Sequence, residues 1–170
     1  IHFAFVVGPV RAEGFHELDT VYQAVGIYDE VQASRRSAGS GISITIEGHQ
    51  VDAVPLDAKN LAWRAAELVA AEADVDADVH LHLVKRIPVA GGMAGGSADA
   101  AGALLACDVL WRASLHRERM LELAAELGSD VPFLIHGGIA LGTGRGERIT
   151  SAMARGSYHW VFALSDRGLS

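Results

Sequence analysis

The sequence has 170 residues, half of them hydrophobic and 21% charged, as expected of one globular domain with a sizeable core. Its formal net charge is −7 and its two lysines are Lys59 and Lys85, which argues against nucleic acid as the main partner, because phosphate backbones attract clustered cations. No apolar run reaches the roughly 18 residues of a membrane helix. The start of the chain also lacks the basic segment of a signal peptide.

Apolar and β-prone runs predict several strands. The clearest alternation of apolar and polar residues, typical of a half-buried strand, is in residues 42–46 and 79–83. Glycines at 142–146 predict a hairpin turn, with a second phosphate loop as the alternative. The other predicted strand segments are 3–7, most of 15–31, the hairpin arms 139–141 and 147–149, and 159–164.

Three segments are predicted as helices: 60–73, with Asp57 as a candidate cap, 97–111, and 117–127, which Gly128 closes. Because the strands are grouped early and the helices are inserted later, the predicted class is α+β, in one domain over residues 1–170. The single Cys107 excludes an internal disulfide framework, and it fits a cytoplasmic protein.

A glycine-rich loop between the predicted strand 79–83 and the helix that follows it is the strongest motif. Glycines let a phosphate approach the backbone amides, and the helix start adds free N–H groups and a positive dipole. A flexible turn before a helix is the alternative. The spacing fits neither a Walker A loop nor G-x-G-x-x-G. The candidate nucleotide-binding residues are Pro88, Val89, Ala90, Gly91, Gly92, Met93, Ala94, Gly95, Gly96, Ser97 and Ala98.

Two polar residues at the start of this helix have candidate roles. Ser97 is expected to cap the helix, or to offer its hydroxyl to a phosphate or a bound Mg²⁺. Asp99 lies in the first turn, where a carboxylate suits the helix dipole.

Residues 88–101 resemble the phosphate-binding motif of the GHMP kinases. The resemblance implies ATP and Mg²⁺ as cofactors. It also implies a two-domain enzyme whose N-terminal half is an α+β domain like domain 2 of ribosomal protein S5.

Residues 128–133 resemble a second segment of that family, Gly-Ala/Ser-Asp-Val-Pro-Phe, whose aspartate is assigned as the catalytic base. On this chain the base is Asp130. A carboxylate within reach of an acceptor alcohol can orient the hydroxyl and take its proton. Considered without the family, Asp130 could equally be an acidic residue at the start of a short helix.

Residues 11–18 resemble the diphosphocytidyl-methylerythritol kinases, one branch of the family. By this resemblance Phe15 stacks on cytosine and His16 hydrogen-bonds its edge, a sensible way to read a pyrimidine. The alternative is a core Phe beside a surface His. Asn60 resembles an adenosine-binding Asn, and a helix-start residue is the other interpretation. His2 stands where a substrate-binding Asn is usual.

The expected function is ATP-dependent phosphorylation of the 2-hydroxyl of 4-diphosphocytidyl-2-C-methyl-D-erythritol, a small molecule, in the non-mevalonate isoprenoid pathway. The family's catalytic Lys would precede Ile1, and its C-terminal domain would follow, so both ends are interpreted as cuts and the isolated chain is expected to be inactive. The alternatives are a sibling kinase for mevalonate-type, homoserine or sugar substrates, and an S5-like RNA-binding module. No metal site is predicted from the histidines.

Overall fold

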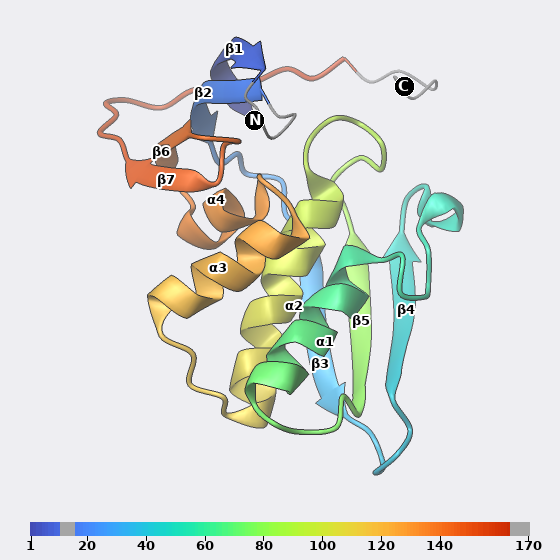
Figure 1. The fold of residues 1–170 in the computed structure, drawn as a ribbon. Coiled ribbons are helices and arrows are strands. Elements are labelled where there is room, and N and C mark those ends of the chain that lie inside the picture. Colours follow the sequence, from blue (N-terminus) through green and yellow to red (C-terminus); the bar gives the residue numbers. More distant parts are fainter. Residues whose placement is uncertain (11–15, 164–170) are drawn as a thin grey trace.

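The computed structural model describes residues 1–10 and 16–163, which form two sheets and a layer of helices (Figure 1). The first sheet has the order β1-β2-β6-β7 and its neighbouring strands are antiparallel. Its strands are β1 (His2–Val10), β2 (His16–Gln23), β6 (Ile139–Thr143) and β7 (Arg148–Ser151).

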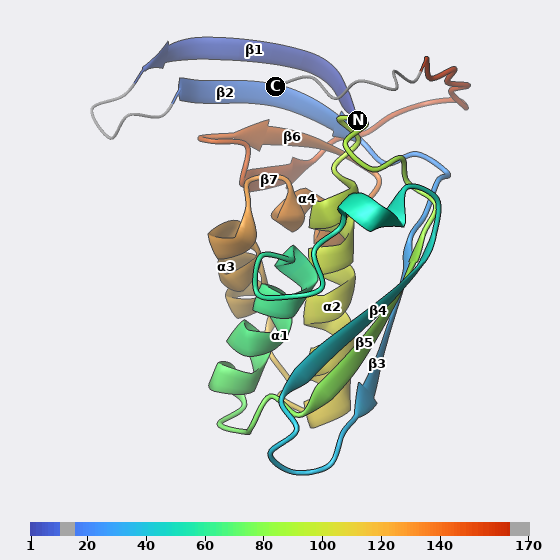
Figure 2. The same ribbon diagram turned by 90° about the vertical axis from the view of Figure 1, so that its right-hand side faces the viewer.

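The second sheet has the order β3-β5-β4, with β3 antiparallel and β4 parallel to the central strand. Its strands are β3 (Glu30–Arg35), β5 (Val79–Lys85) and β4 (Ile42–Gly48). The helices are α1 (Leu61–Glu72), α2 (Gly95–Trp111), α3 (Arg117–Leu127) and α4 (Val131–His136), with a short 3-10 turn at Val51–Ala53. Figures 1 and 2 show the helices on one face of this sheet and β1 and β2 beyond the end of α2.

The main core lies between the second sheet and the helices. Along β5, Val79, Leu81 and Leu83 have no exposed surface, so the predicted alternation sends one face of the strand into the core. The helix α2 lies against this face with small buried residues, among them Ala100 and Ala103, which allow close packing. Because Lys85 is two residues beyond Leu83, the same alternation buries a lysine at the end of the strand.

The α+β class and the predicted helices are confirmed, with α3 matching in both bounds and ending at Gly128. The long strand predicted over 15–31 is instead two strands. β2 pairs in the first sheet and β3 pairs in the second, so the chain must leave one ladder and enter the other between Gln23 and Glu30.

The strand predicted at 159–164 is wrong, because residues 159–163 form no strand. The rings of Tyr158 and Trp160 pack edge-on against Phe3, at 5.9 and 5.7 Å between centroids. This segment therefore meets β1 through side chains rather than through a backbone ladder.

Candidate active site

The glycine-rich loop joins β5 to α2 and borders a cavity of about 330 Å³. The opposite wall comes from residues 53–55, in the connection before α1. Helix α2 begins at Gly95, with Ala94 before it in the left-handed conformation (φ 55°). Since the first amides of a helix have no partner within the helix, they are available to an anion in this cavity.

The predicted capping roles at two helix starts are corrected. Ser97 lies inside the first turn of α2, so it is not the capping residue. At α1 the cap is Asn60 rather than Asp57. The Oδ1 atom of Asn60 accepts from the Ala62 amide at 2.9 Å, whereas the carboxylate of Asp57 accepts from the amide of Lys59.

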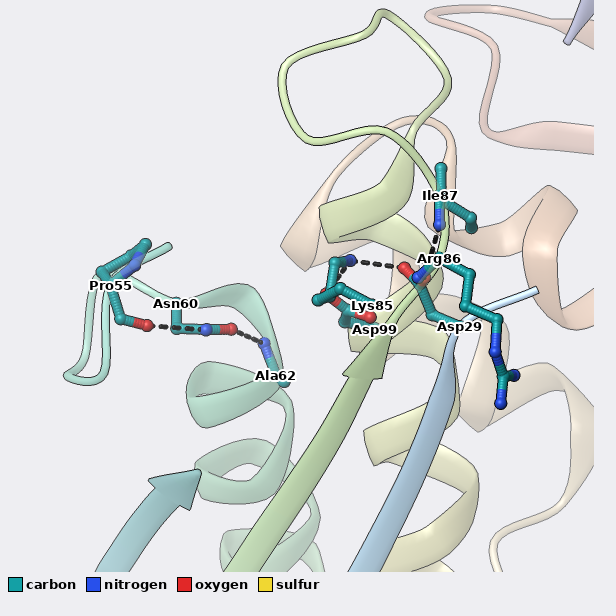
Figure 3. A network of polar contacts seen from close by, with 8 residues as sticks. All are labelled: Asp29, Pro55, Asn60, Ala62, Lys85, Arg86, Ile87 and Asp99. Atoms are coloured by element: carbon teal, nitrogen blue, oxygen red, sulfur yellow. Dashed lines mark hydrogen bonds and ion pairs between the residues drawn. The ribbon is translucent and has the colours of Figure 1, made fainter. Parts of the chain in front are cut away.

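Asn60 also shapes the cavity wall. Its Nδ2 donates to the carbonyl of Pro55 at 2.8 Å, and Pro55 lines the cavity (Figure 3). The oxygen and the nitrogen of this buried side-chain amide therefore both have hydrogen-bond partners within the protein. The structure supports the helix-start interpretation of Asn60, and its contact with adenosine remains a prediction.

Lys85 is the centre of a buried ionic network beneath the loop, which Figure 3 shows. Its ammonium pairs with the carboxylate of Asp29 and, at 2.5 Å, with Oδ2 of Asp99. The three side chains are each at most 3% exposed. A buried charge is tolerated when it is paired, so each of these groups depends on the others.

Asp29 also fixes the start of the loop. Its Oδ1 accepts from the amide of Arg86 at 2.6 Å and from that of Ile87 at 2.8 Å, directly before Pro88. The carboxylate of Asp29 thus contacts Lys85, which lines the cavity, and also fixes the backbone that leads into the glycine-rich loop.

The expected place of Asp99 in the first turn of the helix is wrong, because α2 begins at Gly95 and has no acidic residue in its first turn. The carboxyl group of Asp99 is instead buried against Lys85. Burial raises the pKa of Asp99 to about 7, and the neighbouring ammonium opposes this shift. Its second oxygen, Oδ1, has no hydrogen-bond partner among residues 1–10 and 16–163. Asp99 is therefore a carboxyl group that can hold a proton near neutral pH beside the cavity.

Asp130 immediately precedes α4, but within the described chain its carboxylate does not cap the helix. Instead, Oδ1 accepts a hydrogen bond of 3.1 Å from the hydroxyl of Tyr22 on β2. The ring of Tyr22 stacks on Phe133, with centroids 4.6 Å apart. The carboxylate of Asp130 is therefore held by Tyr22 rather than by the start of α4.

His2 lies in the same region. Its Nδ1 is 2.8 Å from Oγ1 of Thr20, and its ring is 4.8 Å from that of Tyr22. The Thr20 hydroxyl gives its one proton to the carbonyl of Ala4, so Nδ1 of His2 must be the donor. Burial lowers the pKa of His2, and the charge of Asp130 opposes this shift.

A second cavity, of about 340 Å³, brings three parts of the chain together. It is bordered by Ile1 before β1, Met93 in the glycine-rich loop and Phe133 in α4. Met93 lines both cavities. The loop and the Asp130 segment, which are separate in the sequence, are thus neighbours in the fold. Phe15 and the side chain of His16 lie outside the described part of the chain.

Neither a metal cluster nor a membrane helix is found in the parts of the chain that the structure describes. No group of three or more His, Cys, Asp or Glu residues could hold a metal ion there. On the outer face of the second sheet, Thr45 instead bonds both His80 and His82. No described helix is both long enough and apolar enough to cross a bilayer.

Comparison with known proteins shows which proteins this chain is similar to. Residues 60–138 match the family described as GHMP kinases N terminal domain. The chain is 56% identical, over its whole length, to a 4-diphosphocytidyl-2-C-methyl-D-erythritol kinase of Streptomyces coelicolor, of which it covers 56%. It is 53% identical to the kinase of the same name from Thermobifida fusca, of which it covers 57%. Residues 60–138 are therefore assigned to the GHMP kinase N-terminal domain family.

Solved structures agree with this assignment. A crystal structure of 4-(cytidine 5'-diphospho)-2C-methyl-D-erythritol kinase is similar to this chain, with a TM-score of 0.69 and 33% sequence identity. The match covers 89% of this chain and 52% of the crystallised chain. A mevalonate kinase of L. major shares the fold alone, with a TM-score of 0.58 and 14% identity over 72% of this chain. The chain spans about half the length of the curated relatives that it matches.

Sequence reasoning missed two residues of the site, Lys85 and Asp29. The signal for Lys85 was present, because period-two alternation through 79, 81 and 83 puts residue 85 on the buried face. Asp29 had no local signal, since its partners are 56 to 58 residues away.

Proposed function

We propose that this chain is the nucleotide-binding part of a kinase that transfers the γ-phosphoryl group of ATP to the 2-hydroxyl of 4-diphosphocytidyl-2-C-methyl-D-erythritol in the cytoplasm. The observation that carries the proposal is the 56% identity to a kinase of that name over the whole chain. The glycine-rich loop, which opens a helix beside a cavity lined by Lys85, supports it independently.

In this proposal ATP binds with its phosphates at the free backbone amides of the loop 88–98 and with Asn60 at the far wall. The backbone supplies positive potential in a protein whose net charge is −7. Mg²⁺ usually keeps several waters and is held by substrate phosphates with few protein ligands. Ser97, in the first turn of α2, is the residue that would offer it a hydroxyl.

Asp130 is the proposed base. As the acceptor oxygen attacks the γ-phosphorus, its proton passes to the carboxylate while the bond from the γ-phosphorus to the bridging oxygen of ADP breaks. Most of the rate in such a transfer comes from positioning and charge neutralisation. His2, which lies beside Tyr22, is proposed to hold the substrate together with Phe15 and His16.

The test is ATP-dependent phosphorylation of 4-diphosphocytidyl-2-C-methyl-D-erythritol by the complete protein, with mevalonate and homoserine as competing acceptors. Asp130→Asn should lower kcat by about 10²-fold or more and leave ATP binding nearly unchanged. A preference for another acceptor would overturn the substrate assignment. Normal turnover by Asp130→Asn would return Asp130 to a structural role.

The cytosine assignment is tested separately. Phe15→Ala should weaken binding of cytidine diphosphate by about 1–3 kcal/mol, as loss of aromatic stacking on a base does elsewhere. Equal affinities of the parent and the variant would contradict this role for Phe15.

A further inference from the structure

Tyr22 holds the carboxylate of Asp130 from a strand that is 108 residues away in sequence. The tyrosine is 3% exposed, and its ring is nearly parallel to that of Phe133, at an interplanar angle of 14°. Its hydroxyl donates to Oδ1 of Asp130. Burial, together with the charge of Asp130, raises the pKa of Tyr22, so the phenol stays protonated and remains a donor.

Two glycines of the β6–β7 hairpin leave room for this phenol. A Cβ atom at Gly142 would lie 2.5 Å from Cε2 of Tyr22, and one at Gly146 would lie 2.5 Å from its hydroxyl oxygen. The hairpin thus forms the wall behind the tyrosine, which gives these two glycines a structural role.

We propose that Tyr22 is a positioning residue for the base of the phosphoryl transfer. A carboxylate that acts as a base must present one oxygen to the acceptor hydroxyl within hydrogen-bond reach. With Oδ1 held by Tyr22, the carboxylate cannot rotate freely, and Oδ2 is left to take the proton. The helix does not fix Asp130, since the carboxylate is not a cap of α4 within the described residues.

This inference rests on the proposed function, in which Asp130 is the base. It also differs from a purely structural role for Tyr22. The stacked ring would be enough to stabilise the junction of β2, β6 and α4, whereas the hydroxyl is needed only to hold the carboxylate. The hydroxyl can therefore be removed without removing the ring.

The experiment is Tyr22→Phe in the complete protein, with Tyr158→Phe as the matched control. Tyr158 also loses a hydroxyl, but its ring packs on Phe3, away from Asp130. Tyr22→Phe should lower kcat about tenfold or more, a typical cost of misplacing a reacting group. Its KM for ATP and its thermal unfolding temperature should stay close to those of the parent. Tyr158→Phe should leave kcat unchanged.

A double-mutant cycle with Asp130→Asn separates this proposal from the proposed function. Once the carboxylate is gone, Tyr22→Phe should cost no further activity. If Asp130→Asn lowers kcat and Tyr22→Phe does not, the positioning role is wrong and the base assignment stands. An equal loss from Tyr22→Phe in both backgrounds would also overturn the positioning role. A normal kcat in Asp130→Asn would instead remove the base assignment itself.

Discussion

Asp29 and Lys85 form an ion pair in which both side chains are at most 3% exposed, directly beneath the loop proposed to hold the phosphates of ATP. The pair joins the connection before β3 to the end of β5, and Asp99 extends it to α2. One ammonium group thus ties three parts of the chain together, and two of the three side chains, Lys85 and Asp99, line the first cavity.

Lys85→Met should be strongly destabilising, because it removes the ammonium that pairs with the buried carboxylate of Asp29 and with the buried carboxyl group of Asp99. Removing one partner of a buried ion pair costs about 3–5 kcal/mol, and the loss should appear as a lower midpoint of urea unfolding. Lys59→Met is the matched control, since Lys59 is exposed and should change the midpoint little. Equal midpoints for the two variants would show that the network is not needed for stability.

Asp99→Asn should change how stability depends on pH. The folded protein keeps the Asp99 proton up to about pH 7, whereas the unfolded chain loses it near the ordinary aspartate pKa of 3.8. The folded state therefore binds more protons between these values, and the contribution of Asp99 to the free energy of unfolding falls as pH rises from about 4 to about 7.

The asparagine variant lacks this decline, so its stability relative to the parent should rise over the same range. Each pKa unit corresponds to about 1.4 kcal/mol. The measurement is urea unfolding of both proteins at several pH values, with Asp76→Asn, an exposed position, as the control. A constant difference between Asp99→Asn and the parent from pH 5 to pH 8 would refute the assigned titration.

Gly96→Ala should separate nucleotide binding from folding. The nearest atom to an added Cβ is Cδ1 of Leu61, at 4.0 Å, so the methyl group fits the fold but occupies the cavity that Gly96 lines. Alanine also favours the helix over glycine by roughly 1 kcal/mol. Thermal stability should therefore rise slightly while ATP affinity falls.

Calorimetric titration with ATP and a thermal melt test both parts of this prediction. Gly26→Ala is the control, because a Cβ there meets nothing within 4 Å and Gly26 does not line the first cavity. If Gly96→Ala bound ATP as tightly as Gly26→Ala, the phosphates could not approach the backbone at this point.

The predictable parts of this protein are those governed by local pattern. The period of two in 79–83 predicts β5, and the amphipathic run with Gly128 predicts both ends of α3. What the sequence could not predict depends on partners far along the chain. The tyrosine that holds Asp130 lies in a segment predicted only as strand, and nothing near Tyr22 indicates its partner 108 residues away.

The same distinction, between local pattern and partners far along the chain, explains the two strand predictions that were wrong. Residues 159–163 have the apolar character of a strand, but a strand also needs a backbone ladder with a neighbouring strand, and the segment contacts the edge strand β1 through its rings instead. The change of sheet between β2 and β3 is likewise a property of the whole topology. Motif resemblance pointed to both Asp130 and the glycine-rich loop, which are far apart in the sequence, because it carries such long-range information, which local periodicity lacks.

Asn60 offers a test of whether a helix cap also supports the nucleotide site. Asn60→Ser keeps an oxygen that can accept from the amide of Ala62, but it removes the donor that holds the carbonyl of Pro55. Asn60→Ala removes both. Loss of a cap costs about 1 kcal/mol, so the alanine variant should be less stable than the serine variant by about that amount.

ATP affinity should respond differently from stability in these two variants. Because Pro55 lines the cavity, releasing its carbonyl frees one wall of the site, and both variants should bind ATP more weakly and by similar factors. Urea unfolding and ATP titration of the parent, the serine and the alanine variants give the two quantities separately. If the serine variant bound ATP as the parent does, Asn60 would be a helix cap and nothing more, and its proposed place in the nucleotide site would be lost.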